Sequence, residues 1–287
     1  MVKKLLKLLL FGILFIGMEK LIRTQTDGFR LEKTISDFAP KEEWETSFPL
    51  PNAEIFNQPF YFLGSGVQCY AFVSADGETV LKVFKHYHLW PSSKILRKLP
   101  LPKFLQNWKN SILAKREKRI GSIFASAQIA QNQLQQQTGV FHLNLNPKKR
   151  RYPKLTIFDK IGIRYELDLS KTPFLLQKKA DLIFSYLETH KEKTMEIIDS
   201  LFTCIHNRTE LGISNTDPIM HRNFGIRDGE VMEIDIGSFI SNPHVKNPLF
   251  AKRELFYETL ELKDWISKHT PELTKYFEQK LLQAIRT

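Results

Sequence analysis

Four groups of residues in this 287-residue chain have types and spacings that could handle a phosphorylated ligand. The first is the run Gly64-Ser65-Gly66, which stands between two apolar, strand-like segments. Two glycines there would let backbone N–H groups approach phosphate oxygens with no Cβ in the way. An ordinary hairpin turn has the same composition and is the alternative. A dinucleotide-binding turn is disfavoured, because a strand pattern follows the glycines where that motif needs a helix.

The second group centres on Lys82, in the middle of the apolar run Val80-Leu81-Lys82-Val83-Phe84. Strand alternation puts Lys82 on the same face as Val80 and Phe84. A lysine in that position is costly unless an anion receives its charge, which makes Lys82 a candidate phosphate ligand. The alternative is an edge strand, where lysines guard against aggregation.

The third group is Glu117 alone, the only acidic residue between Lys82 and Asp159. On a helix, Glu117 shares a face with Ile120 and Phe124, which is the apolar side. No other residue of that helix could supply a carboxylate partner for Lys82. The alternative is an exposed ion pair between Glu117 and a neighbouring lysine or arginine.

The fourth group combines Asp217 and Asn223 on one expected loop with Asp235 after the following strand. Carboxylate and amide oxygens are hard ligands, and Mg²⁺ is usually held by one or two such side chains together with substrate phosphates. Loop asparagines and aspartates are common singly, but this combination in this order is rare by chance. The spacing therefore predicts a phosphate-linked Mg²⁺ site.

Strands and helices must position these residues. Apolar alternation and Gly or Asp-Gly turns predict strands at 60–63, 70–73, 79–84, 140–145, 173–177, 224–226 and 231–234. Helical periodicity predicts helices at 106–137, 192–211, 252–268 and 272–285. The prolines of 91–102 are expected to break any regular element. The fold class is therefore α+β, with a small antiparallel β lobe that carries one helix, and a second, mainly helical lobe.

With these motifs in this order, the chain resembles the protein-kinase-like superfamily over residues 60–239. It is more similar to the compact members, such as the aminoglycoside and choline phosphotransferases, than to the long protein kinases. The resemblance implies a two-lobed fold with a shortened C-terminal lobe. It also implies ATP and Mg²⁺ as cofactors and a hydroxyl compound of unknown identity as acceptor.

By that resemblance, the N-terminal lobe would bind the nucleotide. Gly64, Ser65 and Gly66 would cover the ATP phosphates. Lys82 would reach the α- and β-phosphates, with Glu117 holding it in place.

The C-terminal lobe would supply the rest of the site. Asp217 would accept or orient the acceptor hydroxyl, and Asn223 and Asp235 would bind the Mg²⁺ that bridges the phosphates. The segment from Gln177 to Asp181 would form the hinge beside adenine.

The chain departs from the family pattern at several points. Cys69 stands where the family has a third glycine, and six positions separate Asp217 from Asn223 where five are usual. No His-Arg pair precedes Asp217, and the motif at Asp235 reads Asp-Ile-Gly. No Ala-Pro-Glu segment follows. These departures favour an alternative, a pseudokinase that binds nucleotide or a protein partner without phosphotransfer.

Composition and charge narrow the classes of protein to which the chain could belong and the kinds of partner it could bind. With 42% apolar and 25% charged residues, the chain is neither disordered nor collagen-like. Two cysteines, Cys69 and Cys204, exclude a disulfide scaffold and suit a reducing compartment. The net charge of +11 comes mostly from the window 82–119, which holds eleven basic residues and one acid.

This basic window points to an anionic partner. Nucleic acid is not expected, because we find no zinc or helix-turn-helix pattern beside the basic residues. We expect instead an anionic membrane surface, contacted through 1–23 and 85–119. A basic membrane-surface or nucleic-acid binder without a nucleotide site is the third hypothesis for function, after the phosphotransferase and the pseudokinase.

The N-terminal segment 1–23 has three lysines before eleven uncharged residues. This length is marginal for a membrane span, and it predicts an uncleaved anchor or an interfacial helix that tethers a cytoplasmic domain. A cleaved secretory signal and a buried helix are the alternatives. The remaining segments are then a linker at 24–58, an N lobe at 59–178 with a basic insertion at 86–106, and a C lobe at 179–287.

Overall fold

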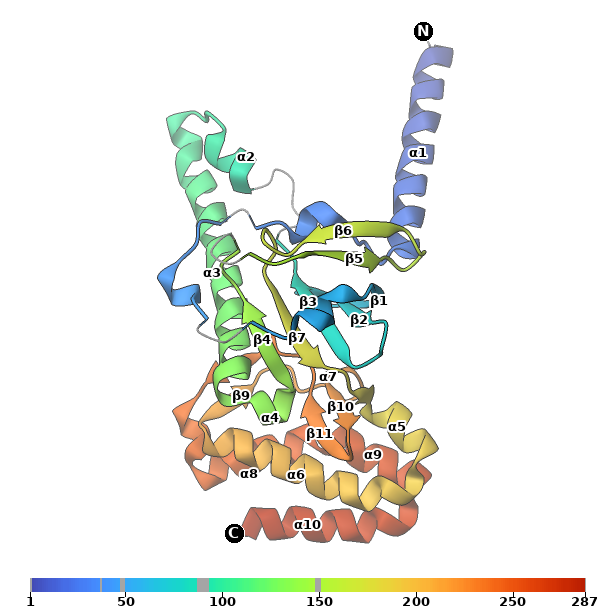
Figure 1. Cartoon of the computed structure of the whole chain (residues 1–287), viewed down its shortest axis with the longest axis vertical. Coiled ribbons are helices and arrows are strands. Elements are labelled where there is room, and N and C mark those ends of the chain that lie inside the picture. The colour runs from blue at the N-terminus through green and yellow to red at the C-terminus, as the bar shows by residue number, and fades with distance from the viewer. Residues whose placement is uncertain (1, 37, 47–49, 87–92, 148–150, 287) are drawn as a thin grey trace. The chain divides into compact units, whose positions relative to one another are not determined.

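The computed structural model describes all residues except 1, 37, 47–49, 87–92, 148–150 and 287. It divides into two compact units, which we call unit 1 (1–114 and 144–176) and unit 2 (115–143 and 177–287). The α+β class is confirmed, with a mostly antiparallel sheet and many helices (Figure 1). The segment boundaries expected from the sequence stay a prediction.

Unit 1 contains most of the strands. Its helices are α1 (Val2–Gln25), α2 (Ser93–Lys98) and the start of α3 (Lys103–Gln133), with short 3-10 helices at Leu31–Thr34, Glu42–Trp44 and Ala53–Asn57. Its strands are β1 (Phe60–Ser65), β2 (Cys69–Ser74), β3 (Thr79–Phe84), β5 (Lys154–Phe158), β6 (Arg164–Asp168) and the start of β7 (Phe174–Lys178).

The strands of unit 1 lie in the order β7-β3-β2-β1-β5-β6. All the pairings described within this set are antiparallel, except the parallel pairing of β1 with β5. The predicted hairpins between 60 and 84 are confirmed, but β5 and β6 were not predicted. Their alternation is short. The paired residues of β1 and β5, such as Phe60 and Ile157, lie 97 positions apart in the chain, so no local turn indicates the pairing.

Two further differences concern segments around the sheet. Residues 91–102 were expected to lack regular structure, yet α2 forms within them, with Leu96 fully buried. The expected linker contributes Phe29, Trp44 and Phe56 to the interior of unit 1. The ring of Phe29 lies 5.0 Å from that of Tyr70, in an edge-to-face contact of the kind that stabilises aromatic cores.

The N-terminal segment 2–25 is helical, as α1. Among the residues that the structure describes, no helix has both the length and the apolar content needed to cross a membrane. The anchor stays a prediction.

Unit 2 is mainly helical. Its helices are the rest of α3, α4 (Gln135–Thr138), α5 (Ile183–Thr189), α6 (Thr194–Glu210), α7 (Met220–Asn223), α8 (Pro248–Glu258), α9 (Leu260–His269) and α10 (Thr274–Arg286), with 3-10 helices at Lys191–Lys193, Pro243–Lys246 and Pro271–Leu273. Its strands are most of β4 (Val140–Asn144), the end of β7, β8 (Asp181–Leu182), β9 (Ile213–Asn215), β10 (Phe224–Arg227), β11 (Glu230–Glu233) and β12 (Phe239–Ser241).

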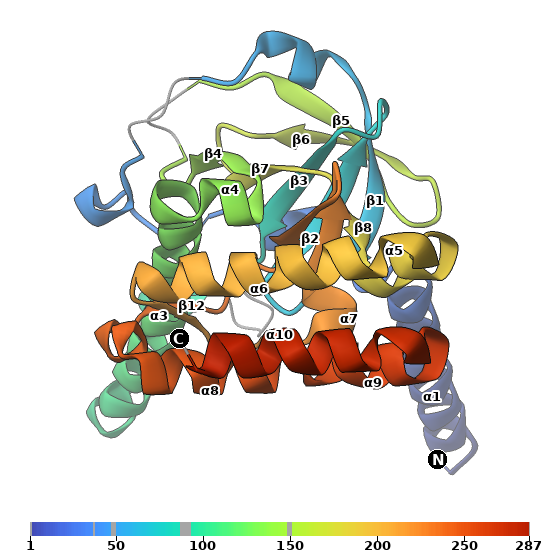
Figure 2. The same ribbon diagram turned by 90° about the horizontal axis from the view of Figure 1, so that it is seen from below.

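The amphipathic helix α6 organises this unit. It packs against α8 and α10, which also contact each other (Figure 2). Its apolar side includes Ile198, Leu201 and Ile205, and it faces a core shared with Phe224, Phe277 and other buried residues. The helix ends before Gly212, whose φ of 75° provides the left-handed stop that the sequence predicted.

The predicted hairpin of β10 and β11 is also confirmed. Asp228 and Gly229 form its two-residue turn with φ angles of 53° and 81°, and both values are left-handed. Such turns match the twist of antiparallel strands and favour Asp-Gly. The turn thereby fixes the register that brings Glu233 and Asp235 to the end of β11 nearest Asn223.

Candidate functional site

The side chain of Arg208 lies fully buried on the apolar side of α6. Its Nε is 2.8 Å from Oε1 of Glu233 on β11, and its Nη2 is 2.6 Å from Oε2 of Glu258 on α8. Its Nη1 is 3.4 Å from Oε2 of Glu254, also on α8. One guanidinium therefore joins a helix, a strand and a second helix through three carboxylates. We call these four residues the arginine cluster.

Three carboxylates around one guanidinium leave an excess of negative charge inside unit 2. Burial raises the pKa of Glu258 to about 8, and the negative charge of Glu233 acts in the same direction, while Arg208 opposes them. Burial thus favours the protonated form of Glu258, and a proton there would lower the cost of burying the cluster.

The cluster extends to the loop of Asp217 through Asn215. The side-chain Nδ2 of Asn215 donates to Oε2 of Glu233 at 2.6 Å. Its Oδ1 accepts from the hydroxyl of Ser238 at 2.7 Å and from the backbone N–H of Asp217 at 3.0 Å. Since Asn215 is buried, this amide holds the backbone next to Asp217 in one conformation.

Asn223 connects the loop of Asp217 to that of Asp235. Its Nδ2 donates to the backbone carbonyl of Asp217 at 2.6 Å, and its own carbonyl accepts from the N–H of Ile234 at 2.8 Å. The carboxylate of Asp235 accepts from the N–H of Gly237 at 3.1 Å. Hydrogen bonds of Asn223 thus connect the backbone of Asp217 with the segment that carries Asp235, which the sequence placed after the following strand.

A helix supports the Asp235 loop from within unit 2. The hydroxyl of Ser126 on α3 donates to the carbonyl of Ile236 at 2.5 Å and accepts from the N–H of Phe239 at 2.7 Å. Ser126 is buried, so these bonds are shielded from water. The loop that carries Asp235 is fixed at both ends.

The residues present fit a Mg²⁺ ion. In the part of the chain that the structure describes, no group donates a hydrogen bond to Oδ1 of Asn223 or to Oδ2 of Asp235. Two such oxygens suit Mg²⁺, which takes its other ligands from water and phosphates. No cluster of three or more His, Cys, Asp or Glu side chains suited to a metal occurs among the described residues. A metal at this place would therefore depend on a phosphate-bearing ligand.

Asp217 itself is only half-buried, and an arginine lies against it. Nη2 of Arg222 is 3.2 Å from Oδ2 of Asp217, and both side chains are about half exposed. An exposed pair of this kind contributes little to stability. The pair does place the positive charge of Arg222 against Asp217, the carboxylate predicted to accept or orient the acceptor hydroxyl.

In unit 1, the Gly64–Gly66 segment lies at the end of β1 and in the turn to β2. The N–H of Gly66 donates to the carbonyl of Cys69 at 3.0 Å, which closes the turn. Among the residues that the structure describes, a Cβ added to Gly64 would meet no atom within 4 Å, and one added to Gly66 would meet only that carbonyl, at 3.9 Å. Neither glycine has a left-handed φ. Packing within the chain therefore does not explain why these positions are glycine.

Lys82 lies on β3, which has β2 and β7 as neighbours on its two sides. The edge-strand explanation for this lysine is therefore wrong. Its side chain is half-buried and lies opposite Ala71 in the register. Glu117 is half-buried on α3, in unit 2. The pairing of Lys82 with Glu117 stays a prediction.

Gln177 uses its side chain within unit 2. Its Nε2 donates to the carbonyl of Thr138 at 2.6 Å and to that of Ile234 at 3.3 Å. The side chain is buried, and its amide nitrogen is engaged by these two bonds. Gln177 also connects to the residue that precedes Asp235.

Lys85 is a residue near the glycines that sequence reasoning missed. Its Nζ donates to the hydroxyl of Ser65 at 2.7 Å and to the carbonyl of Gly66, and it lies 4.1 Å from the centre of the Tyr70 ring. Burial lowers the pKa of Lys85 to about 8. Lys85 follows the last residue of β3, so the alternation of the strand did not single it out, although the basic window 82–119 includes it.

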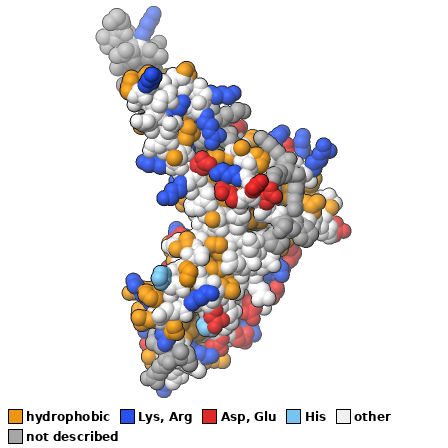
Figure 3. All heavy atoms as spheres, turned by 90° about the vertical axis from the view of Figure 1, so that its left-hand side faces the viewer, with side chains coloured by type: hydrophobic (Ala, Val, Ile, Leu, Met, Phe, Trp, Pro, Cys, Tyr) orange, Lys and Arg blue, Asp and Glu red, His pale blue; other side chains and the backbone are white. Residues whose placement is uncertain are grey.

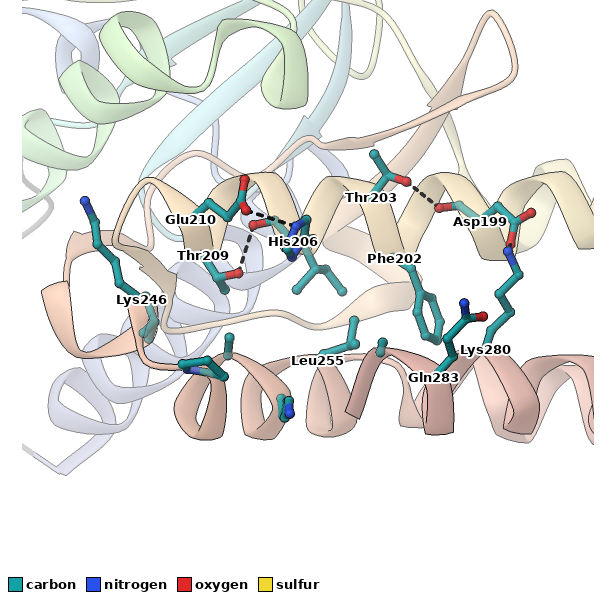
Figure 4. A pocket seen from close by; sticks show the side chains of 16 residues that line it. Asp199, Phe202, Thr203, His206, Thr209, Glu210, Lys246, Leu255, Lys280 and Gln283 are labelled. Carbon is teal, nitrogen blue, oxygen red and sulfur yellow. Dashed lines mark hydrogen bonds and ion pairs between the residues drawn. The ribbon is translucent and has the colours of Figure 1, made fainter. Parts of the chain in front are cut away.

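Unit 2 also has a cavity of about 570 Å³ between α6, α8 and α10 (Figure 4). None of the residues predicted for the site lines it. The ion pair of Lys280 with Asp199 lies at one end of it and Lys246 at the other, with Leu255 between them. A smaller cavity of about 290 Å³ is lined by Asn215 and by Pro218, the residue after Asp217.

Replacing Arg208 by methionine should destabilise the protein strongly. The substitution leaves the buried carboxyl groups of Glu233 and Glu258 without their cation, and breaking a buried pair in this way costs about 3–5 kcal/mol. Thermal or urea unfolding at neutral pH measures the loss. Arg222→Met is the control, because it removes only an exposed pair and should cost less than about 1 kcal/mol. Equal losses in the two variants would contradict the central position of Arg208.

The raised pKa of Glu258 predicts a pH dependence of stability. Between about 4.5 and about 8 the folded protein holds a proton on Glu258 that the unfolded chain releases. The free energy of unfolding should therefore fall as pH rises through this window, by an amount on the order of a few kcal/mol. Glu258→Gln cannot release the proton and should flatten this slope in unfolding measured from pH 5 to 8. The same substitution at the exposed Glu188 on α5 should keep the wild-type slope. A wild-type slope in Glu258→Gln would show that another group is responsible.

No family model matches the chain, and no curated protein matches it in sequence. Among solved structures, it is similar to the bifunctional kinase–methyltransferase WbdD, with 14% identity and a TM-score of 0.34 over 68% of this chain and 34% of that one. It is also similar to Rv3197 of Mycobacterium tuberculosis, solved in complex with erythromycin, with 13% identity and a TM-score of 0.34 over 82% of this chain and 66% of that one. The chain spans about a third and just under two thirds of their respective lengths. These distant likenesses include a kinase, and they do not establish a family.

Proposed function

We propose that this chain is an ATP- and Mg²⁺-dependent phosphotransferase of the protein-kinase-like fold that acts on a hydroxyl acceptor. The observation that carries the proposal is the hydrogen-bonded connection of Asp217, Asn223 and Asp235 within unit 2. Phosphoryl transfer needs positioning and neutralisation of charge more than covalent chemistry. A few rigidly held oxygen ligands can provide both.

In this proposal unit 2 holds the metal and orients the acceptor. Oδ1 of Asn223 and Oδ2 of Asp235 would hold Mg²⁺, and the ion would neutralise charge on the phosphates. The carboxylate of Asp217 accepts or orients the proton of the attacking hydroxyl. The arginine cluster keeps these groups in place through Asn215, so the ligands need little reorganisation when the nucleotide arrives.

Unit 1 supplies positive charge and backbone donors for the nucleotide phosphates. The open space around Gly64 and Gly66 gives phosphate oxygens access to the backbone. Lys82 is the assigned phosphate ligand and Glu117 its assigned holder. Lys85 adds a second cation at the turn. In this proposal its ammonium group exchanges its hydrogen bond to the hydroxyl of Ser65 for one to a phosphate oxygen.

The smaller cavity of unit 2 is the candidate acceptor cavity. It begins at Pro218, beside Asp217, and Tyr257 and Arg253 also line it. Its volume of about 290 Å³ is at the lower limit for small-molecule sites. An acceptor of modest size fits better than a folded protein substrate.

Mg²⁺-dependent transfer or hydrolysis of the ATP γ-phosphate by the purified chain tests the proposal. Asp217→Ala should lower turnover by about 10²–10⁴-fold, since it removes the group that handles the proton. Asp235→Ala should abolish the dependence on Mg²⁺ together with turnover. Asp264→Ala, an exposed substitution on α9, is the control and should keep full activity. Activity that survives in both site variants would refute these assignments.

The glycines give an independent test of nucleotide binding. Gly64→Ala and Gly66→Ala should fold with wild-type stability, because a Cβ at either position meets open space. If phosphates approach this backbone, the same methyl groups should weaken ATP binding by about tenfold or more. Titration with ATP and Mg²⁺, followed by fluorescence or calorimetry, measures the change. Wild-type affinity in both variants would show that phosphates do not bind here.

A pseudokinase is the second candidate function, and Arg222 favours it. Its guanidinium lies against the carboxylate of Asp217, where a catalytic carboxylate needs access to the acceptor. A pseudokinase should show a thermal shift with ATP but no turnover, either in the wild type or in Arg222→Ala. Turnover that rises in Arg222→Ala would instead identify Arg222 as a restraint on an active enzyme.

A further inference from the structure

The segment 93–109, which we call the basic hairpin, carries charge of one sign only. It contains Lys94, Arg97, Lys98, Lys103 and Lys109 and no acidic residue. The sequence around it, from 85 to 116, is also free of acidic residues. Most charged protein surfaces mix the two signs, so a run of this kind favours an anionic partner.

The basic hairpin consists of α2, a closed turn and the first turns of α3. Nε2 of Gln106 donates to the carbonyl of Leu101 at 2.7 Å, and Nζ of Lys109 donates to that of Leu99 at 3.3 Å. The N–H of Leu105 donates to the carbonyl of Pro102 at 2.9 Å. These bonds fix α2 against the start of α3, and Leu96 lies buried on the inner side of α2.

The outer side of the hairpin exposes large apolar side chains. Phe104 is 79% exposed and Trp108 is 53% exposed, and their spacing of four places them on one face of α3. Leu99, at the end of α2, is 39% exposed. Figure 3, which faces this side of the molecule, shows hydrophobic side chains among the blue lysines and arginines. Packing within unit 1 does not cover these residues.

We infer that the basic hairpin docks on the surface of an anionic lipid bilayer. Phe104 and Trp108 enter the interface between headgroups and acyl chains, which is where aromatic side chains are enriched in membrane proteins. Lys103 precedes Phe104 and Lys98 precedes Leu99 in the chain, and in this inference both lysines contact the lipid phosphates. This contact differs from the one expected of the N-terminal helix, and it does not depend on nucleotide chemistry.

The apolar residues favour lipid over nucleic acid as the partner. Aromatic side chains can stack on bases, but aliphatic side chains such as Leu99 gain nothing from stacking. They do gain free energy in the acyl region of a bilayer. A charged helical face that bears both kinds of apolar residue is therefore better matched to a membrane surface.

The test measures binding of the full chain to vesicles. Vesicles of equal parts phosphatidylcholine and phosphatidylglycerol should bind the protein, and vesicles of phosphatidylcholine alone should bind it much less. Phe104→Ser with Trp108→Ser should weaken binding to the anionic vesicles by about tenfold or more. Lys98→Ser with Lys103→Ser should weaken it about fivefold for each lysine.

Matched controls separate this surface from general loss of charge or apolar area. Lys191→Ser with Lys275→Ser removes two exposed lysines of unit 2, and Met195→Ser with Leu249→Ser removes two exposed apolar residues. Both control proteins should bind the anionic vesicles like the wild type. Every variant keeps the N-terminal helix, so its contribution is common to all of them.

Tryptophan fluorescence reports whether the hairpin itself enters the bilayer. Brominated lipids in the anionic vesicles should quench emission from the wild type. Trp108→Phe keeps an apolar ring, so it should bind with wild-type affinity. In a Trp90→Phe background, where the remaining Trp44 and Trp265 are buried, it should lose most of that quenching.

Three outcomes would overturn the inference. The first is wild-type vesicle binding by both hairpin variants, and the second is quenching that persists in Trp108→Phe in the Trp90→Phe background. The third is a hairpin effect seen only with RNA or DNA, or only on dimerisation measured by sedimentation, because the partner would then be nucleic acid or a second copy. Nucleotide binding and turnover of the same variants are measured separately, so failure here leaves the proposed function standing.

Discussion

The buried guanidinium of Arg208 is the constraint on which unit 2 depends. A single cation without access to water must be surrounded by carboxylates, and Glu233, Glu254 and Glu258 come from a strand and a neighbouring helix. Apolar residues tolerate small shifts in packing, but a buried ion pair is stable only in a narrow range of geometry. The relative positions of α6, β11 and α8 are therefore set by electrostatics, and the apolar core fills the space around them.

The candidate site is an outer layer of this polar network. The side chain of Asn215 is oriented by its hydrogen bond to Glu233, and its oxygen in turn accepts from the backbone N–H of Asp217. Asn223 does the same between the segments of Asp217 and Asp235. Loops that carry function are usually among the more mobile parts of a protein. Here the loop residues are bonded to a buried cluster, so the site is as rigid as the interior that supports it.

Local chemistry in the sequence predicted the local structure. The turns at Asp228-Gly229 and Gly212 need left-handed backbone, and the glycines and the Asp-Gly pair predict it from the sequence. The roles of Asp217, Asn223 and Asp235 came from a resemblance, and the structure adds the bonds that connect them. Arg208 could not be assigned, because its partners Glu254 and Glu258 lie 46 and 50 residues away. The parallel pairing of β5 with β1 was missed for the same reason. Lys85 lay in a window too uniformly basic to single out one lysine.

The interleaving of the two units affects how the chain can fold during synthesis. Residues 115–143 belong to unit 2, yet the ribosome delivers them before any residue of 177–287. Ile120, Phe124 and Ala127, which are buried in the finished protein, therefore emerge while most of their unit does not yet exist. Unit 1 must likewise wait for residue 176 before it is complete. Because vectorial folding works best for units contiguous in sequence, the nascent chain is open to aggregation until its last helices have been made.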